Sequence, residues 1–132
     1  LRKGSRNREQ RRIAEGAEST LKMLRQRGYR LAVLSNNDSR LRSVLNDHNI
    51  ASLFDEIFIS SELGVEKPDP AIFRAVEQTM SENPSAFLHL GDSHSRDFEG
   101  AQKAGWSALL YGHPMIEKLQ IKTFPELLDH LP

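Results

Sequence analysis

The chain contains no cysteine among its 132 residues. This absence excludes a disulfide framework and a zinc site built from thiolates, although it does not fix the compartment. No apolar run approaches the roughly 18 residues that span a bilayer, and the first residues contain no apolar signal-peptide segment. We therefore expect a cytoplasmic protein that makes no membrane contact.

Neither sign of charge prevails, because 18 Lys and Arg residues balance 18 Asp and Glu residues. Without a global electrostatic field we expect no nucleic-acid partner, so that a ligand must be recognised at a local site. The length corresponds to about one domain. A composition of 38% hydrophobic and 27% charged residues is typical of a soluble globular chain with one modest core. No sequence feature indicates the oligomeric state.

The first stretch differs from the rest, because residues 1–12 carry six Arg and Lys residues against the single acid Glu9. Such a run could be a nucleic-acid or lipid arm, but it has no interleaved aromatic residue, and a solvated helix face or frayed end is the simpler interpretation. We therefore predict a basic segment over residues 1–14 and a core domain over residues 15–132.

Strand and helix patterns alternate through this core domain. Short apolar runs predict strands at Leu31–Leu34, Ile57–Ile59, Phe87–Leu90 and Ala108–Tyr111. Helical spacing and capping residues predict helices from Ala17 to Arg27, after Asp38 or Ser39, from Pro70, around Ala101–Ala104, and from about Phe124 to Leu131. The first apolar run is expected to be a strand covered on both faces. The alternation indicates an α/β three-layer sandwich with a parallel sheet and right-handed crossovers.

Polar motifs follow two of these predicted strands, and a third polar motif lies in a loop. Ser35 and Asn36 end the first strand, Lys67 lies in a Lys-Pro-Asp-Pro loop, and Asp92 and Asp97 follow the third strand. Ligands of such sheets bind outside the carboxyl ends of the strands, so the first and third strands should bring their motifs together. A serine, a lysine and two carboxylates are the groups that Mg²⁺-assisted chemistry on a phosphate needs.

Each motif by itself also has a simpler interpretation. Ser-Asn-Asn after a strand is often a turn with a helix cap, and Lys-Pro-Asp-Pro could be a rigid loop with an exposed lysine. The acid pair is harder to explain this way, because a helix cap needs one acid whereas Mg²⁺ favours clustered carboxylates. We interpret His89, within an apolar strand, as a core residue and His94, in a polar turn, as a loop residue.

In their order and context the motifs resemble those of the haloacid dehalogenase-like (HAD) hydrolases, a Rossmannoid family of mostly Mg²⁺-dependent phosphatases. The resemblance covers about residues 15–112. It implies that Ser35 and Asn36 bind the phosphoryl group and that Lys67 binds its charge and steadies the nucleophile, so that Ser35 and Lys67 are catalytic. It further implies that Asp92 is a direct Mg²⁺ ligand and that Asp97 supports the water shell of the metal.

The chain departs from this family at the nucleophile, which is the first aspartate of an Asp-x-Asp motif on the first strand. The acids before Ser35 are Glu9, Glu15 and Glu18, and none follows an apolar run. The first strand of the family lies between the strands that end here at Ser35 and Asp92. We therefore predict a sheet whose first strand is missing, and we interpret residues 1–14 as the last helix of a cap domain.

Together these features predict the C-terminal part of a phosphatase whose full-length form acts on a small phosphorylated metabolite, with the isolated chain inactive. The alternative is a non-catalytic, truncated HAD-like module that binds or interacts. A dehalogenase is disfavoured because those members use no metal and lack the Gly-Asp pair. A receiver domain is disfavoured because its acids belong at the start of the chain. An upstream apolar strand ending in Asp-x-Asp would distinguish the enzyme from the module.

Overall fold

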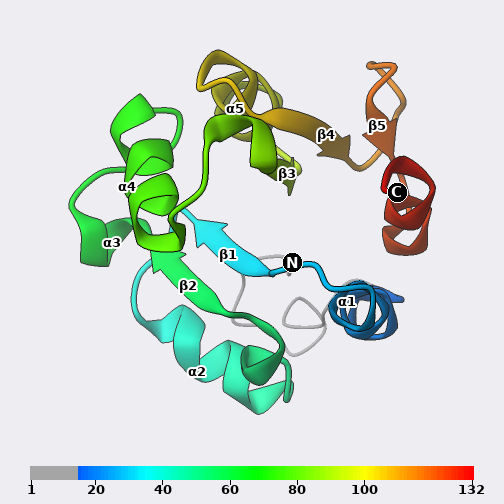
Figure 1. The fold of residues 1–132 in the computed structure, drawn as a ribbon, viewed down its shortest axis with the longest axis horizontal. Helices are drawn as coiled ribbons and strands as arrows, with labels where there is room; N and C mark the ends of the chain where they lie inside the picture. Colours follow the sequence, from blue (N-terminus) through cyan, green and yellow to red (C-terminus); the bar gives the residue numbers. More distant parts are fainter. Residues whose placement is uncertain (1–14) are drawn as a thin grey trace.

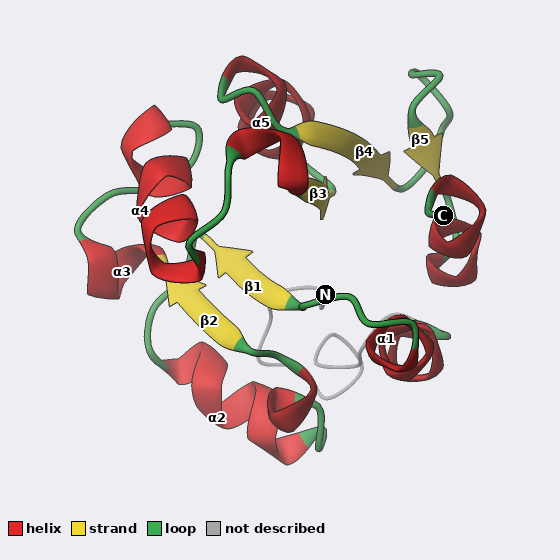
Figure 2. Ribbon diagram, in the orientation of Figure 1, coloured by secondary structure: helices red, strands yellow, loops and turns green. Residues whose placement is uncertain are grey.

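The computed structural model describes residues 15–132, so the predicted basic segment 1–14 lies outside the described residues. The strands are β1 (Ala32–Ser35), β2 (Glu56–Ile59), β3 (Leu88–Gly91), β4 (Ser107–Tyr111) and β5 (Gln120–Ile121). The α-helices are α1 (Ala17–Gln26), α2 (Arg40–Asp47), α3 (Ser60–Leu63), α4 (Pro70–Met80) and α5 (Gly100–Lys103). Figures 1 and 2 show that helices alternate with strands from α1 to β4, as the sequence pattern predicts, whereas a loop without a helix joins β4 to β5. No helix within residues 15–132 is long and apolar enough to cross a membrane.

The strands form two separate parallel sheets. One sheet pairs β1 with β2, and the other has the order β3-β4-β5. In register, Ser35 lies opposite Ile59 and Gly91 lies opposite Leu110, so the carboxyl ends of paired strands share an edge. Within the part of the chain that the structure describes, no strand pairs with the second edge of β1 or of β3. This arrangement is the one expected for a sheet that lacks the strand between them.

Alternating side chains of β4 and β2 define the three layers. In β4, Ala108 and Leu110 join a core cluster with α4 and α5, whereas Leu109 joins a second cluster with α1 and the C-terminal segment. In β2, Phe58 faces the first of these clusters and Ile59 packs with α2. Because successive strand residues point to opposite faces, this alternation confirms helices on both sides of the sheets.

Local signals place the helix ends as expected. The carboxylate of Asp69 accepts a hydrogen bond of 2.9 Å from the backbone N–H of Ala71, and Pro70 occupies the first turn of α4. Gly28 follows α1 with a φ of 92°, the left-handed conformation that commonly ends a helix at glycine.

The structure corrects two of the predicted elements. The first strand is Ala32–Ser35 and is not covered on both faces: Ala32 is exposed and the next three residues are half-buried, because among residues 15–132 β1 has a pairing partner on one edge only. The segment Phe124–His130 is a 3₁₀ helix rather than the predicted α-helix. The pattern also missed α3 and the two-residue strand β5, which are too short to carry a periodic signal.

Candidate active site

The ammonium group of Lys67 joins the two halves of the sheet. Its Nζ donates a hydrogen bond of 3.1 Å to the backbone oxygen of Leu34 in β1 and forms an ion pair with Asp97, which follows β3. Lys67 is buried, with 8% of its surface exposed. A buried ammonium is costly unless it is paired, and here both partners are supplied by the edge of the sheet where the motifs were expected to meet.

The side chain of Asn36 fixes the backbone of Lys67 in place. The amide Nδ2 of Asn36 donates to the carbonyl of Lys67 at 3.0 Å, and Oδ1 accepts from the N–H of Lys67 at 2.8 Å. The backbone of the next residue, Asn37, is held by the hydroxyl of Ser60, the first residue of α3, which accepts from its N–H at 3.0 Å and donates to its carbonyl at 3.1 Å. The turn after β1 is therefore built to position the lysine loop, and a contact of Asn36 with a ligand would have to use its backbone.

Both carboxylate oxygens of Asp97 are occupied. Oδ1 faces Lys67 Nζ and His89 Nε2, the latter at 3.0 Å, and Oδ2 accepts the backbone N–H of Ser93 at 3.0 Å. Burial by itself raises the pKa of this carboxyl group, but the hydrogen bond from His89, the positive charge and hydrogen bond of Lys67, and the N–H of Ser93 outweigh it and hold the pKa well below its usual range. Asp97 is therefore a carboxylate.

A π-helical segment, His94–Glu99, carries Asp97 to this position. The hydroxyl of Ser93 caps the segment by accepting the N–H of Arg96 at 3.1 Å, and the N–H of Phe98 reaches back five residues to the carbonyl of Ser93. Such wide turns are rare and occur frequently at functional sites.

The surface of β3 beneath Asp97 is shaped to receive it. His89 and Gly91 are two residues apart and therefore lie on the same face of the strand. A Cβ atom built on Gly91 would lie 2.6 Å from the Cβ of Asp97 and would overlap its carboxyl group. The glycine before Asp92 thus makes room for the second acid.

The two remaining candidates, Ser35 and Asp92, end the strands on either side of this cluster. Ser35 is the half-buried last residue of β1, and Asp92 is exposed directly after β3. Of the predicted residues, the structure thus links Asn36, Lys67 and Asp97 by hydrogen bonds, and Ser35 and Asp92 stand at the ends of the two strands that this cluster connects. Within residues 15–132 no group of three or more His, Asp or Glu side chains is arranged to hold a metal ion.

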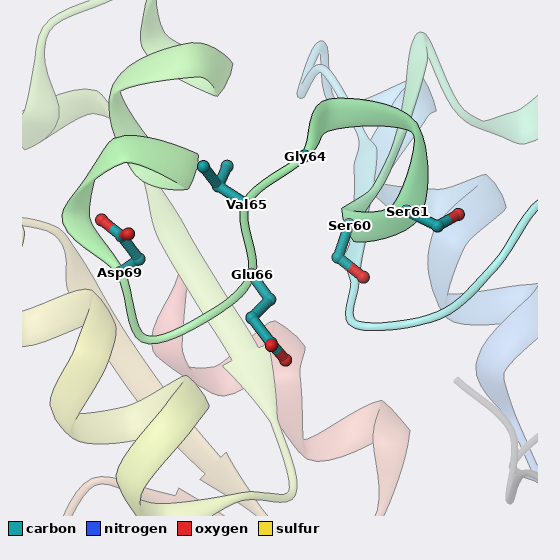
Figure 3. A pocket seen from close by; sticks show the side chains of 6 residues that line it. All are labelled: Ser60, Ser61, Gly64, Val65, Glu66 and Asp69. Carbon is teal, nitrogen blue, oxygen red and sulfur yellow. The ribbon is translucent and has the colours of Figure 1, made fainter.

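A shallow depression lies along the segment from α3 to the residue before α4, as Figure 3 shows. Its volume is about 420 Å³, and its lining residues are Ser60, Ser61, Gly64, Val65, Glu66 and Asp69. It contains none of the residues predicted to bind phosphate or metal. The Lys67 cluster, and not this depression, therefore holds the residues that the sequence predicts for phosphate and metal.

Sequence reasoning missed the role of His89. Its side chain is buried, as a core interpretation requires, but it also contacts Asp97, so it is more than an apolar filler. The available signal was its spacing: a histidine two residues before Gly91 lies on the face that the glycine leaves open.

Sequence comparisons show the family of the chain. The profile of the haloacid dehalogenase-like hydrolases matches residues 5–105. The chain is 42% identical over 98 residues to haloacid dehalogenase-like hydrolase domain-containing protein 3 of Mus musculus, covering 74% of this chain and 39% of that protein. It is 36% identical over 100 residues to a glyceraldehyde 3-phosphate phosphatase of Methanothermobacter thermautotrophicus, covering 75% of this chain and 44% of that protein. The chain thus spans less than half the length of these relatives.

A solved structure gives the same answer for the fold. The magnesium-bound HAD-hydrolase YfnB of Bacillus subtilis superposes with a TM-score of 0.82 and 25% identity, over 92% of this chain and 56% of that chain. A match to the family profile over most of the sequence, together with this structural likeness, leads to one conclusion. The chain belongs to the haloacid dehalogenase-like hydrolase family.

Proposed function

We propose that this chain is the phosphate- and metal-binding part of a Mg²⁺-dependent phosphatase that acts on a small phosphate monoester. The observation that carries the proposal is the buried ammonium of Lys67, held between the carbonyl of Leu34 and the carboxylate of Asp97 at the shared carboxyl edge of β1 and β3. A fixed positive charge at that edge suits the phosphoryl group, whose charge grows on its peripheral oxygens during transfer. The relative named a glyceraldehyde 3-phosphate phosphatase supports the same substrate class.

The exposure and hydrogen bonds of each residue indicate its role in the proposed site. The hydroxyl of Ser35 and the backbone N–H of Asn36 would bind the phosphoryl oxygens, and Lys67 would balance their charge. Asp92 is exposed at the strand end and fits one Mg²⁺ ligand, because Mg²⁺ commonly uses one or two carboxylates, with waters and substrate phosphate completing its shell. Asp97 fits an orienting role, since both of its oxygens already accept hydrogen bonds.

Bound Mg²⁺ would supply charge neutralisation for the phosphoryl oxygens. The nucleophile is not among the residues at the site, since no acid before Ser35 follows an apolar run. We therefore expect the chain by itself to bind Mg²⁺ and phosphate weakly and to hydrolyse an aryl phosphate no faster than buffer containing Mg²⁺. Turnover that Asp92→Asn abolishes would contradict this expectation, because a contaminating phosphatase would not respond to that substitution.

The binding itself is tested with Mg²⁺ and inorganic phosphate, followed by amide NMR shifts. We expect shifts at residues 34–36, 67 and 91–97, and a loss of Mg²⁺ affinity of roughly tenfold in Asp92→Asn. Asp129→Asn is the matched control, because Asp129 is exposed in the C-terminal 3₁₀ segment and should leave the affinity unchanged. Shifts confined to other regions, or equal effects of the two substitutions, would show that the chain forms no such site.

A further inference from the structure

We propose that His89 is a positioning residue: its Nε2–H group holds Asp97, and Asp97 in turn holds the Lys67 ammonium at the carboxyl edge of the sheets. Only the expected effect on phosphate binding depends on the proposed function. The arrangement of the three side chains is a separate statement about the chain itself.

The geometry gives Asp97 three donors from three parts of the chain. His89 Nε2 in β3 lies 3.0 Å from Oδ1, which also faces Lys67 Nζ, and the N–H of Ser93 lies 3.0 Å from Oδ2. Without the imidazole, Oδ1 would depend on the flexible lysine side chain alone. The rigid strand therefore fixes the carboxylate through His89, and the carboxylate fixes the lysine.

The protonation state of the imidazole follows from its partner. Burial lowers the pKa of His89, and the nearby charge of Lys67 acts in the same direction, so the ring is neutral despite the opposing effect of Asp97. An ionised carboxylate only accepts hydrogen bonds, so Nε2 must carry the proton. The structure thus requires the Nε2–H tautomer.

Aromatic neighbours keep the ring in this orientation. Phe73 and Trp106 meet His89 edge-on, each with a centroid distance of 6.2 Å and with interplanar angles of 85° and 74°. Trp106 is itself anchored, because its Nε1 donates to Glu77 Oε2 at 2.7 Å. Packing alone would be served by an apolar ring at position 89, whereas a buried polar ring is stable only where its hydrogen bond is made.

The first measurement needs no substitution. A ¹⁵N NMR spectrum of the imidazoles of the wild-type chain should show His89 neutral, protonated at Nε2 and not at Nδ1. The same sample should show a protected ammonium resonance for Lys67. A neutral ring protonated only at Nδ1 would overturn the proposal, because such a ring has no Nε2–H to donate to Asp97.

Two substitutions then separate positioning from packing. His89→Gln keeps an N–H donor at about the place of Nε2, and we expect it to retain the Lys67 ammonium resonance. His89→Phe keeps the aromatic packing but removes the donor, and we expect the resonance to be lost. A role in packing alone predicts the reverse order, with Phe tolerated and Gln disruptive. If His89→Phe does not fold, the wild-type tautomer and the behaviour of His89→Gln decide the question.

Binding of inorganic phosphate in the presence of Mg²⁺ tests whether the arrangement of His89, Asp97 and Lys67 supports the candidate site. Substitutions of residues that orient a binding group commonly cost 10–100-fold, so we expect about a tenfold loss of affinity in His89→Phe and little change in His89→Gln. If the wild-type chain binds no phosphate, the proposed function fails while the NMR signals still decide the positioning role. An unchanged Lys67 resonance in folded His89→Phe would refute the positioning role even if phosphate binds.

Discussion

At the scale of single residues, Gly91 illustrates how one absent side chain shapes the site. The carboxyl group of Asp97 occupies the space where the Cβ of an alanine at position 91 would lie. Lys67 and His89 hold that carboxyl group through its Oδ1 atom. The two residues of the Gly-Asp sequence therefore have separate roles. The glycine admits Asp97, and Asp92 continues the chain to the exposed end of the strand.

This arrangement predicts that Gly91→Ala destabilises the chain by about 2–3 kcal/mol, because the added methyl group overpacks a buried contact. Gly28→Ala is the matched control: nothing lies within 4 Å of an added Cβ there, and its cost is the left-handed φ alone, about 1 kcal/mol. Urea unfolding of both variants measures the difference. A free energy of unfolding that falls no further in Gly91→Ala than in Gly28→Ala would show that Asp97 does not occupy this space in solution.

At the scale of elements, an ion pair ties the short helix α3 to α2 beside β2. Arg42 NH2 lies 2.7 Å from Glu62 Oε1, and the hydroxyl of Ser39 donates to Oε2 at 2.7 Å. The hydrogen bonds from Arg42 and then from Ser39 lower the pKa of Glu62 to about 2. All three side chains are at the surface, so we expect salt to screen this link.

A pH titration tests the link. The folded pKa of Glu62 lies below its ordinary value of 4.5, so its contribution to stability is present above that value and is lost as the pH falls toward 2. We expect the Glu62 carboxyl ¹³C signal to titrate near pH 2 in the wild type and nearer its ordinary value in Arg42→Gln. Arg40→Gln is the control, because Arg40 pairs with Asp38 instead. An ordinary pKa for Glu62 in the wild-type chain would mean that the ion pair does not persist in solution.

At the scale of the whole molecule, the split between the sheets is the dominant feature. In residues 15–132, β1 and β3 each use one edge, and Lys67 and its partners bridge the two halves at the carboxyl end. Unpaired strand edges expose N–H and carbonyl groups that can bind another extended segment. We therefore expect the isolated chain to be marginally stable or to self-associate.

A peptide that supplies an apolar strand ending in Asp-x-Asp-Gly-Thr should bind between β1 and β3. Its binding should raise the thermal midpoint with concentration, by about 2.7 kcal/mol of stabilisation at a hundredfold excess over the dissociation constant. Mg²⁺ affinity should rise with it, and a peptide with Asn for the first Asp should stabilise the chain without that rise. If the chain is monomeric and its thermal midpoint does not change with peptide concentration, the two sheets close without a further strand.

Much of the fold follows from local patterns. The apolar runs located four of the five strands to within about a residue, and the caps at Asp69 and Gly28 set helix ends, because these signals act between neighbours in sequence. The apolar pattern does not predict β5, because two residues are too few to show a periodicity. This strand exists only because Leu110 and Tyr111 of β4 pair with it. The exposure of β1 likewise depends on a missing neighbour rather than on its own apolar sequence.

The same division holds for the candidate site. The sequence by itself determined which chemical groups are available and that Ser35 and Asp92 stand at the ends of strands, since an apolar run precedes each of them. Only the tertiary structure decided that Asp97 uses both oxygens on Lys67, His89 and Ser93, and that Asn36 serves the lysine backbone. Lys67 lies 30 residues from Asp97 in the chain, and contacts over such a separation are set by how helices and sheets pack, which no local pattern encodes.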